Sequence, residues 1–240
     1  MKTVVIYGTM HKGSTYHCTQ LLLERLSAEQ DMPVKEFFLP RDMPHFCNSC
    51  FSCFNNGEST CPHYESMRPI VAALDEADLI ILSSPCYVLD VSGQMKAFLD
   101  HLGYRWMPHR PNASMFRKVG IVISTAAGSG TSATNKTMKR SLTFWGVKRI
   151  FSFGANVRAS KWEEIKPELQ QKIKNRIQNL SSKVLNTSRK IEKLRPRLFT
   201  VIIFNLMKST MKEEHWNKTD CRHWKSSGWL DGKRPWNENK

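Results

Sequence analysis

Short apolar runs alternate with longer amphipathic runs over the first two thirds of the chain, and this alternation constrains the fold more than any other feature. Uniformly apolar runs of this length are typical of strands that are covered on both faces, while the longer runs have the length and periodicity of helices. The predicted strands cover residues 3–7, 34–39, 79–83, 119–125 and 149–154. The predicted helices cover residues 15–30, 67–76, 92–102, 131–144 and 161–189. Strands that alternate with helices in this way predict a parallel sheet with crossover helices.

Five strand and helix pairs with right-handed crossovers leave few topologies, and the flavodoxin-like strand order 2-1-3-4-5 is the one that fits best. We therefore predict an α/β three-layer sandwich over residues 1–190, with helices on both faces of the sheet. After Pro196 the alternation stops, and residues 191–240 are predicted to form a helical, Trp-rich extension. Four of the seven tryptophans lie in this extension, so we expect it to pack onto the rest of the molecule.

The chain has 240 residues, of which 40% are hydrophobic, and this suits a single large core. The first apolar run is too short for the core of a signal peptide, and residues 198–207, the longest later run, are too few to span a bilayer. We expect a cytoplasmic protein without a transmembrane segment. In a reducing compartment the seven cysteines are expected to be metal ligands, catalytic groups or packing residues rather than disulfides.

The net charge of +15 is distributed unevenly along the chain. Residues 151–240 carry 20 Lys and Arg against 9 Asp and Glu, whereas residues 1–150 are close to balanced. A basic C-terminal part can be an ordinary solvated surface, or it can bind an anionic membrane or nucleic acid. No nucleic-acid motif accompanies the basic segment 189–197, so no specific nucleic acid is expected, while weak peripheral contact with a membrane stays open.

In an open α/β sheet, ligands bind beyond the carboxyl ends of the strands, so the loops after the first, third and fourth strands are the candidates. The loop GTMHKGST at residues 8–15 is almost a phosphate-binding loop of the Walker type, but Ser14 stands where the lysine belongs. This substitution argues against ATP or GTP hydrolysis. Small residues and hydroxyls before a helix can still bind one phosphate monoester, or they can simply cap the helix.

The other two loops are suited to a flat heterocyclic ligand. Residues 83–92 offer backbone amides and the ring of Tyr87, which can stack on such a ligand or can simply pack on the surface. Residues 125–131 are small and rich in glycine, so a ligand could approach the backbone closely.

These three segments, GTMHKGST, SSPCYVLDVSGQMKAFLDHL and STAAGSG, resemble the FMN-binding loops of the flavodoxin-like NAD(P)H-dependent FMN reductases. The resemblance covers about residues 1–155 and implies FMN as cofactor and NAD(P)H as transient co-substrate. His11 and Leu89 depart from the family, in which Arg and Gly are common at these places. By this resemblance the FMN phosphate contacts Thr9, His11, Lys12, Gly13, Ser14 and Thr15, the ring lies against Pro85, Cys86, Tyr87 and Val88, and Thr125, Ala126, Ala127, Gly128 and Gly130 close over the ring.

Four further cysteines, Cys47, Cys50, Cys53 and Cys61, lie in one loop within residues 45–63. Thiols separated by two residues can point into one cavity, and a more distant fourth thiol completes a [4Fe-4S] ligand set. Zinc sites usually use two separated pairs, but zinc stays open, as does a metal-free loop. We expect this loop to lie beside the flavin edge. Cys18, Cys86 and Cys221 are isolated and are read as packing residues.

The cysteine motif together with the three loops resembles the iron-sulfur flavoproteins, in which FMN and a [4Fe-4S] cluster exchange electrons. The resemblance implies an electron-transfer flavoprotein whose acceptor is a ferredoxin-like protein or a small molecule. Separately, we expect a homo-oligomer (a dimer or tetramer), with the basic, Trp-rich extension packed on the domain or on a second subunit. Without a cluster, the chain would be an FMN-dependent reductase of quinones, nitro compounds or flavins. No Ser, His and Asp constellation or carboxylate pair stands out, so we assign no catalytic side chain.

Overall fold

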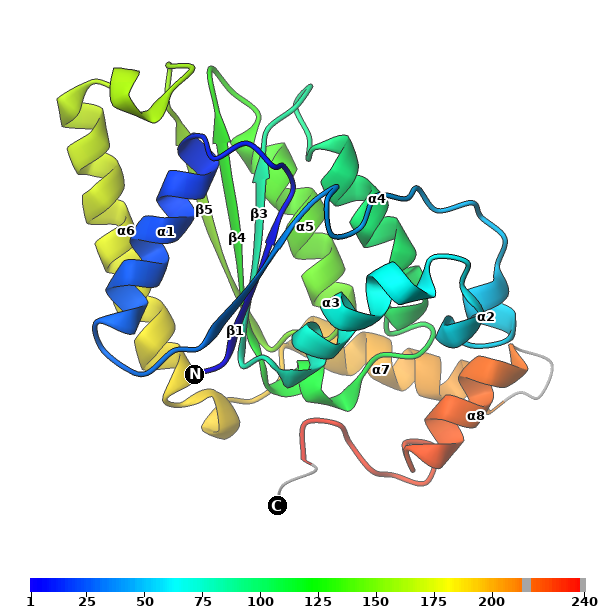
Figure 1. The fold of residues 1–240 in the computed structure, drawn as a ribbon. Helices are drawn as coiled ribbons and strands as arrows, with labels where there is room; N and C mark the ends of the chain where they lie inside the picture. The colour runs from blue at the N-terminus through cyan, green and yellow to red at the C-terminus, as the bar shows by residue number, and fades with distance from the viewer. Residues whose placement is uncertain (213–216, 238–240) are drawn as a thin grey trace.

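The computed structural model describes residues 1–212 and 217–237, which are built around one sheet of five parallel strands. The strand order β2-β1-β3-β4-β5 confirms the predicted flavodoxin-like topology (Figure 1). The strands are β1 (Thr3–Tyr7), β2 (Val34–Phe38), β3 (Leu79–Pro85), β4 (Val119–Ala126) and β5 (Arg149–Asn156).

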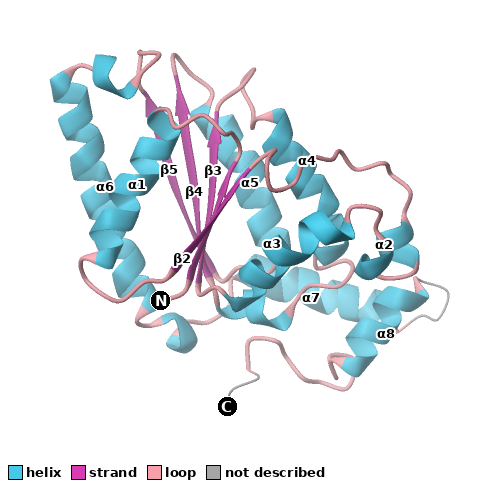
Figure 2. Cartoon of the chain, in the orientation of Figure 1, coloured by secondary structure: helices cyan, strands magenta, loops and turns pink. Residues whose placement is uncertain are grey.

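Helices cover both faces of the sheet and make the three layers that Figure 2 shows. One face carries α1 (Ser14–Ser27) and α6 (Pro167–Ser188), whose apolar sides pack on alternate residues of the strands. The other face carries α3 (Tyr64–Glu76), α4 (Gly93–His101) and α5 (Thr131–Phe144). Each helix therefore shields one face of the sheet from water.

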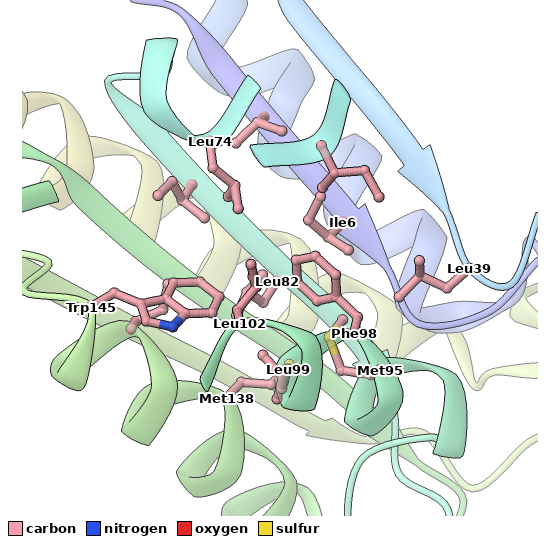
Figure 3. Close-up of a cluster of buried hydrophobic side chains, with 14 of the residues drawn as sticks. Ile6, Leu39, Leu74, Leu82, Met95, Phe98, Leu99, Leu102, Met138 and Trp145 are labelled. Atoms are coloured by element: carbon pink, nitrogen blue, oxygen red, sulfur yellow. The ribbon is translucent and has the colours of Figure 1, made fainter. Parts of the chain in front are cut away.

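Side chains alternate between the two faces along β1, where Val4 and Ile6 join the core under α4 while Val5 and Tyr7 join the core under α1. Figure 3 shows the first of these cores, in which Ile6 and Leu82 meet Phe98. The strands β1, β3 and β4 are buried along their whole length except for Pro85, which explains their uniformly apolar sequences.

The C-terminal extension contains η5 (Ile191–Lys193), α7 (Leu198–Thr210) and α8 (Lys218–Ser226). Phe204, Trp224 and Trp229 are fully buried and form a third core with Phe116 and Met107 of the preceding domain. The expectation that the tryptophan-rich tail packs onto the molecule is correct for these residues; Trp216 lies outside the described part. The division of the chain at residue 190 stays a prediction.

Three predicted helices differ from the structure by three residues or more. The helix predicted at 15–30 ends at Ser27, and the one predicted at 67–76 begins at Tyr64. The helix predicted at 161–189 divides into η4 (Trp162–Glu164) and α6. The division falls before Pro167, which starts α6 at a position where proline is favoured. Short elements that the sequence did not predict are α2 (Ser52–Asn55), η1 (Glu58–Thr60), η2 (Gly103–Arg105) and η3 (Ala113–Arg117).

Candidate functional site

The three candidate loops meet at the carboxyl edge of the sheet and line one cavity of about 230 Å³. Loop 8–13 joins β1 to α1, loop 86–92 joins β3 to α4, and loop 127–130 joins β4 to α5. Parallel strands bring these loops together because the carboxyl ends of all five strands lie at the same edge. The predicted residues that line the cavity are Thr9, His11, Gly13, Ser14, Thr15, Pro85, Cys86, Tyr87, Thr125, Ala126 and Ala127.

Hydrogen bonds hold the loops in place. The hydroxyls of Thr15 and Thr125 share a bond of 2.6 Å, which ties the start of α1 to the end of β4. The Cys86 amide donates to Thr125 O at 2.9 Å. Ser92, the N-cap of α4, accepts from the Met95 amide at 3.2 Å and donates to Gly8 O at 2.5 Å. These bonds fix the spacing of the three loops around the cavity.

The N-terminus of α1 provides the anion-binding end of the cavity. Its N-cap is Gly13, which has no side chain to bond the first amides of the helix, so these amides are open to a ligand. The His11 amide donates to Thr9 Oγ1 at 3.1 Å, which folds the loop back toward the helix. This geometry suits the single phosphate monoester that the sequence predicted, with no lysine at position 14.

Two glycines let the loops come close to one another. A Cβ atom on Gly8 would lie 2.7 Å from Ser92 Oγ, and one on Gly130 would overlap Cys86 Sγ. Gly130 also has φ of +105°, which L side chains rarely adopt. Both positions therefore require glycine if the loops are to keep their spacing.

Some predicted site residues do not line the cavity. Lys12 lies over the ring of Tyr16, with its Nζ 5.3 Å from the ring centroid. Val88 is fully exposed, whereas a Cβ added at Gly128 would meet no atom within 4 Å, and Gly130 packs against Cys86. Their assignment to a cofactor stays a prediction.

The cavity also includes three residues that the sequence analysis missed: Val157, Ala159 and Ser160. They follow β5, whose carboxyl end lies at the same edge as the others. The rule that selected the first three loops, if applied to the fifth strand, would have found them.

Strained backbone gathers at this site and at the cysteine loop. Among the described residues, five non-glycine residues have positive φ: Ser49, Phe51, Val88, Leu89 and Arg158. The first two flank Cys50, and Val88 and Leu89 form a tight turn whose ends, Tyr87 and Asp90, bond each other's backbone. Such conformations persist only where the surrounding structure enforces them, and they cluster at functional sites.

The four predicted cysteine ligands line a second cavity, of about 260 Å³. The loop that carries Cys47 and Cys50, the helix α2 with Cys53, and the segment of Cys61 surround it, and His63 and His101 complete its wall. His63 Nδ1 and His101 Nε2 share a hydrogen bond of 2.8 Å. The structure thus brings all four thiols to one place.

The thiols are close enough to affect one another's ionisation. Burial, followed by the neighbouring Cys61 and Cys47, raises the pKa of Cys53 to about 11, whereas hydrogen bonds from Ser52 lower the pKa of Cys50. In the described part of the chain, no three His, Cys, Asp or Glu side chains are positioned to hold a metal ion as they stand. The donor set nevertheless fits a thiolate-ligated group, because four thiols and a cavity between them are present.

The cysteine cavity does not lie beside the three loops that line the first cavity, although the sequence analysis expected the cysteine loop at that edge. Ser92, at the start of α4, bonds the first loop, while Asp100 and His101, at the end of α4, line the cysteine cavity. A helix of this length spans about 14 Å. The long connection after β2 carries the cysteines away from the carboxyl edge (Figure 1).

Comparison with known proteins places this chain among flavin-dependent reductases. Over 234 residues it is 25% identical to an iron-sulfur flavoprotein of Archaeoglobus fulgidus, which covers 96% of this chain and 100% of that protein. An iron-sulfur flavoprotein of Methanocaldococcus jannaschii is 26% identical over 170 residues, 68% of this chain and 83% of that protein.

Solved structures share the fold at low sequence identity. An FMN-dependent NADH-azoreductase from Bacillus anthracis in complex with FMN has a TM-score of 0.59 and 14% identity, covering 77% of this chain and 99% of that one. An NAD(P)H:quinone oxidoreductase from Methanothermobacter marburgensis also has a TM-score of 0.59 and 14% identity. The match covers 81% of this chain and 98% of that one. Residues 1–159, which carry all three loops of the first cavity, match the NADPH-dependent FMN reductase family. The chain therefore belongs to this family of flavin oxidoreductases.

Proposed function

We propose that this flavin oxidoreductase binds FMN in the three-loop cavity, takes electrons from NAD(P)H and passes them to an acceptor through a [4Fe-4S] cluster held by Cys47, Cys50, Cys53 and Cys61. The observation that carries the FMN assignment is the convergence of the three loops on one cavity next to the uncapped N-terminus of α1. The phosphate is assigned to this helix end, with Thr9, His11 and Ser14 around it. The ring is assigned to the edge formed by Pro85 to Tyr87 and Thr125 to Ala127.

Bound FMN would supply the electron and hydride chemistry, so the chain's own residues have to bind and orient it. Amides at the start of α1 neutralise the phosphate charge, and the Thr15 and Thr125 pair fixes the loops on either side. Tyr87 lines one side of the cavity, and the backbone bonds between Tyr87 and Asp90 hold this turn in place. No general acid or base is assigned.

The cluster assignment rests on the four thiols around one cavity. The alternatives are zinc at the same thiols, or a metal-free loop in an FMN-dependent reductase of quinones, nitro compounds or flavins. Tetrahedral zinc needs only a space the size of one ion, whereas the cavity lined by the four cysteines has about 260 Å³, and this volume favours the larger group.

The test is to purify the protein without oxygen, record its ultraviolet-visible spectrum, and quantify flavin, iron, zinc and acid-labile sulfide. We expect one FMN and about four irons per chain. Cys50→Ser is expected to lose iron and sulfide but keep FMN, whereas Cys18→Ala, on α1 and outside both cavities, is the matched control and should keep both. Flavin with one zinc, or flavin without metal, would select the corresponding alternative, and absence of flavin would refute the oxidoreductase proposal.

We infer a second function, contact with an anionic membrane surface, from α7. Leu198, Ile202 and Leu206 follow one another at helical spacing and are 74%, 54% and 57% exposed. Basic residues precede and follow this helix in the sequence, and residues 189–212 contain one acidic residue, Glu192. The charge favours anionic lipid over a second copy of the same basic face. No helix of the described residues is long and apolar enough to cross a membrane. The basic residues are Arg189, Lys190, Lys193, Arg195, Arg197, Lys208 and Lys212.

Sedimentation with lipid vesicles tests this function. Binding is expected to vesicles that contain phosphatidylglycerol and not to pure phosphatidylcholine, and to weaken with salt. Ile202→Ser and Leu206→Ser together should reduce it, while Val34→Ser, at an exposed position on β2, should not. Absence of vesicle binding would refute the inference, and self-association that the same double variant abolishes would assign the face to a second copy instead.

A further inference from the structure

The short helix α2, which carries Cys53, depends on groups outside itself. The last carbonyls of any helix lack partners within the helix, and in α2 no residue is fully buried. Three carbonyls at its end accept hydrogen bonds from distant side chains. Arg110 donates to Cys53 O and, at 3.2 Å, to Phe54 O, while Asn217 Nδ2 donates to Phe54 O at 3.0 Å and Thr219 Oγ1 to Asn55 O at 2.5 Å.

Two of these donors, Asn217 and Thr219, lie at the start of α8. The third donor, Arg110, is bonded to α8 through Asp220. Asp220 on α8 is fully buried and accepts from Arg110 Nη1, and its other oxygen shares a 2.8 Å hydrogen bond with His109 Nδ1. Trp224 fixes the helix further, because its Nε1 donates to His109 O at 2.7 Å. Figure 1 shows α8 next to α2, in agreement with their contacts.

We propose that α8 is a clamp for the cysteine cavity, in which Asp220 holds Arg110 so that Arg110, Asn217 and Thr219 together fix α2 and with it Cys53. Arg110 also lies 3.8 Å from Glu58 in η1, three residues before Cys61. One buried guanidinium thus connects both the third and the fourth cysteine segments to α8. Asp220 is a positioning residue, because it is not among the residues that line the cysteine cavity.

The proposal gives a role to the C-terminal extension. The family match ends at residue 159, so α8 lies outside the part that builds the flavin cavity. The expected effect of α8 on metal retention rests on the proposed cluster, whereas its expected effect on the position of α2 does not. The two can therefore be separated by experiment.

The first readout needs no metal. In chelator-treated protein, the rates at which iodoacetamide alkylates Cys53 and Cys50 are compared by mass spectrometry. In Asp220→Asn, which removes the charge but keeps the shape, we expect Cys53 to react about tenfold faster because local opening of α2 exposes it, and Cys50, which is already exposed, to change little. Thr219→Val removes a single bond to α2 and should give a smaller change in the same direction. Asp231→Asn, an exposed acid in the same extension, is the matched control.

The second readout is the half-life of bound iron under a chelator, which should shorten in Asp220→Asn while FMN content is kept. Faster Cys53 alkylation in a protein that never binds iron would support the clamp and refute the cluster. Unchanged Cys53 alkylation in folded Asp220→Asn and Thr219→Val would overturn the clamp, whatever the metal content. If Asp220→Asn does not fold, Thr219→Val decides.

Discussion

Replacing Gly130 by alanine tests whether the loop after β4 is held as closely to the Cys86 loop as the structure indicates. Gly130 has φ of +105°, and a left-handed conformation costs an L residue about 1–2 kcal/mol. Its new Cβ would also overlap Cys86 Sγ and lie 3.0 Å from Leu89 Cδ2, and such overpacking costs about 1–3 kcal/mol. We expect the free energy of unfolding to fall by about 2–5 kcal/mol, which lowers Tm by roughly 5–15 °C in a chain of this size.

Two further variants separate the cost of the left-handed backbone conformation from the cost of the overlap with Cys86. Gly128→Ala is the matched control, because its new Cβ would have no other atom within 4 Å and its φ is not in the left-handed region; its unfolding free energy should change by less than about 0.5 kcal/mol. In a Cys86→Ala background the overlap with sulfur is removed, so Gly130→Ala should cost about 1 kcal/mol less than it does in the parent chain.

The assay is urea unfolding of the flavin-free protein, followed by fluorescence titration with FMN. Weaker FMN binding by Gly130→Ala is expected, because the displaced loop lies at the cavity. Equal costs for Gly128→Ala and Gly130→Ala, or no coupling to Cys86, would refute the loop geometry.

Three other substitutions should change the free energy of unfolding by amounts that follow from the structure. Ser92→Ala removes the N-cap of α4 and the bond to Gly8 O, so urea unfolding should show a loss of about 0.5–2 kcal/mol. Burial lowers the pKa of Lys118 to about 8, so between pH 8 and 10 the unfolded chain holds a proton that the folded chain releases. The free energy of unfolding should therefore rise with pH, relative to Lys118→Met, by up to about 1.4 kcal/mol per unit, and a flat difference would contradict this. Trp229→Ala, in the C-terminal core, should cost about 3–5 kcal/mol in the same assay, and a cost under about 1 kcal/mol would show that the extension is not packed as described.

The sequence was sufficient for the sheet and for the three loops because both depend on local patterns. Strands such as Leu79–Pro85 are nearly uniformly apolar, and parallel pairing then fixes which loops share an edge. The position of the cysteine loop could not be predicted in this way. Residues 39–51 have neither helix nor strand periodicity, so their path from β2 to the far end of α4 depends on tertiary contacts alone.

The hydrogen bonds that connect α8 and Arg110 to α2 could not be predicted from the sequence either. Arg110 and Asp220 are separated by 110 positions, and nothing in the composition of either segment marks them as a buried pair. The tryptophan content of the extension indicated that it packs somewhere, but not that its first helix turn bonds the carbonyls of α2. A buried ion pair between distant segments is evident only from coordinates.

The two candidate sites therefore differ in what supports them. Each loop of the flavin cavity follows a strand of the central sheet and is bonded to its neighbours, as Thr15 is to Thr125. The cysteine loop follows β2, an edge strand with exposed side chains, and its helix α2 buries no residue fully. Met43 anchors the start of this loop in the core, but Cys53 and Phe54 only pack against that core, so the order of α2 depends in addition on Arg110 and on α8. Perturbing the extension should then loosen the cysteine cavity before it affects the flavin cavity.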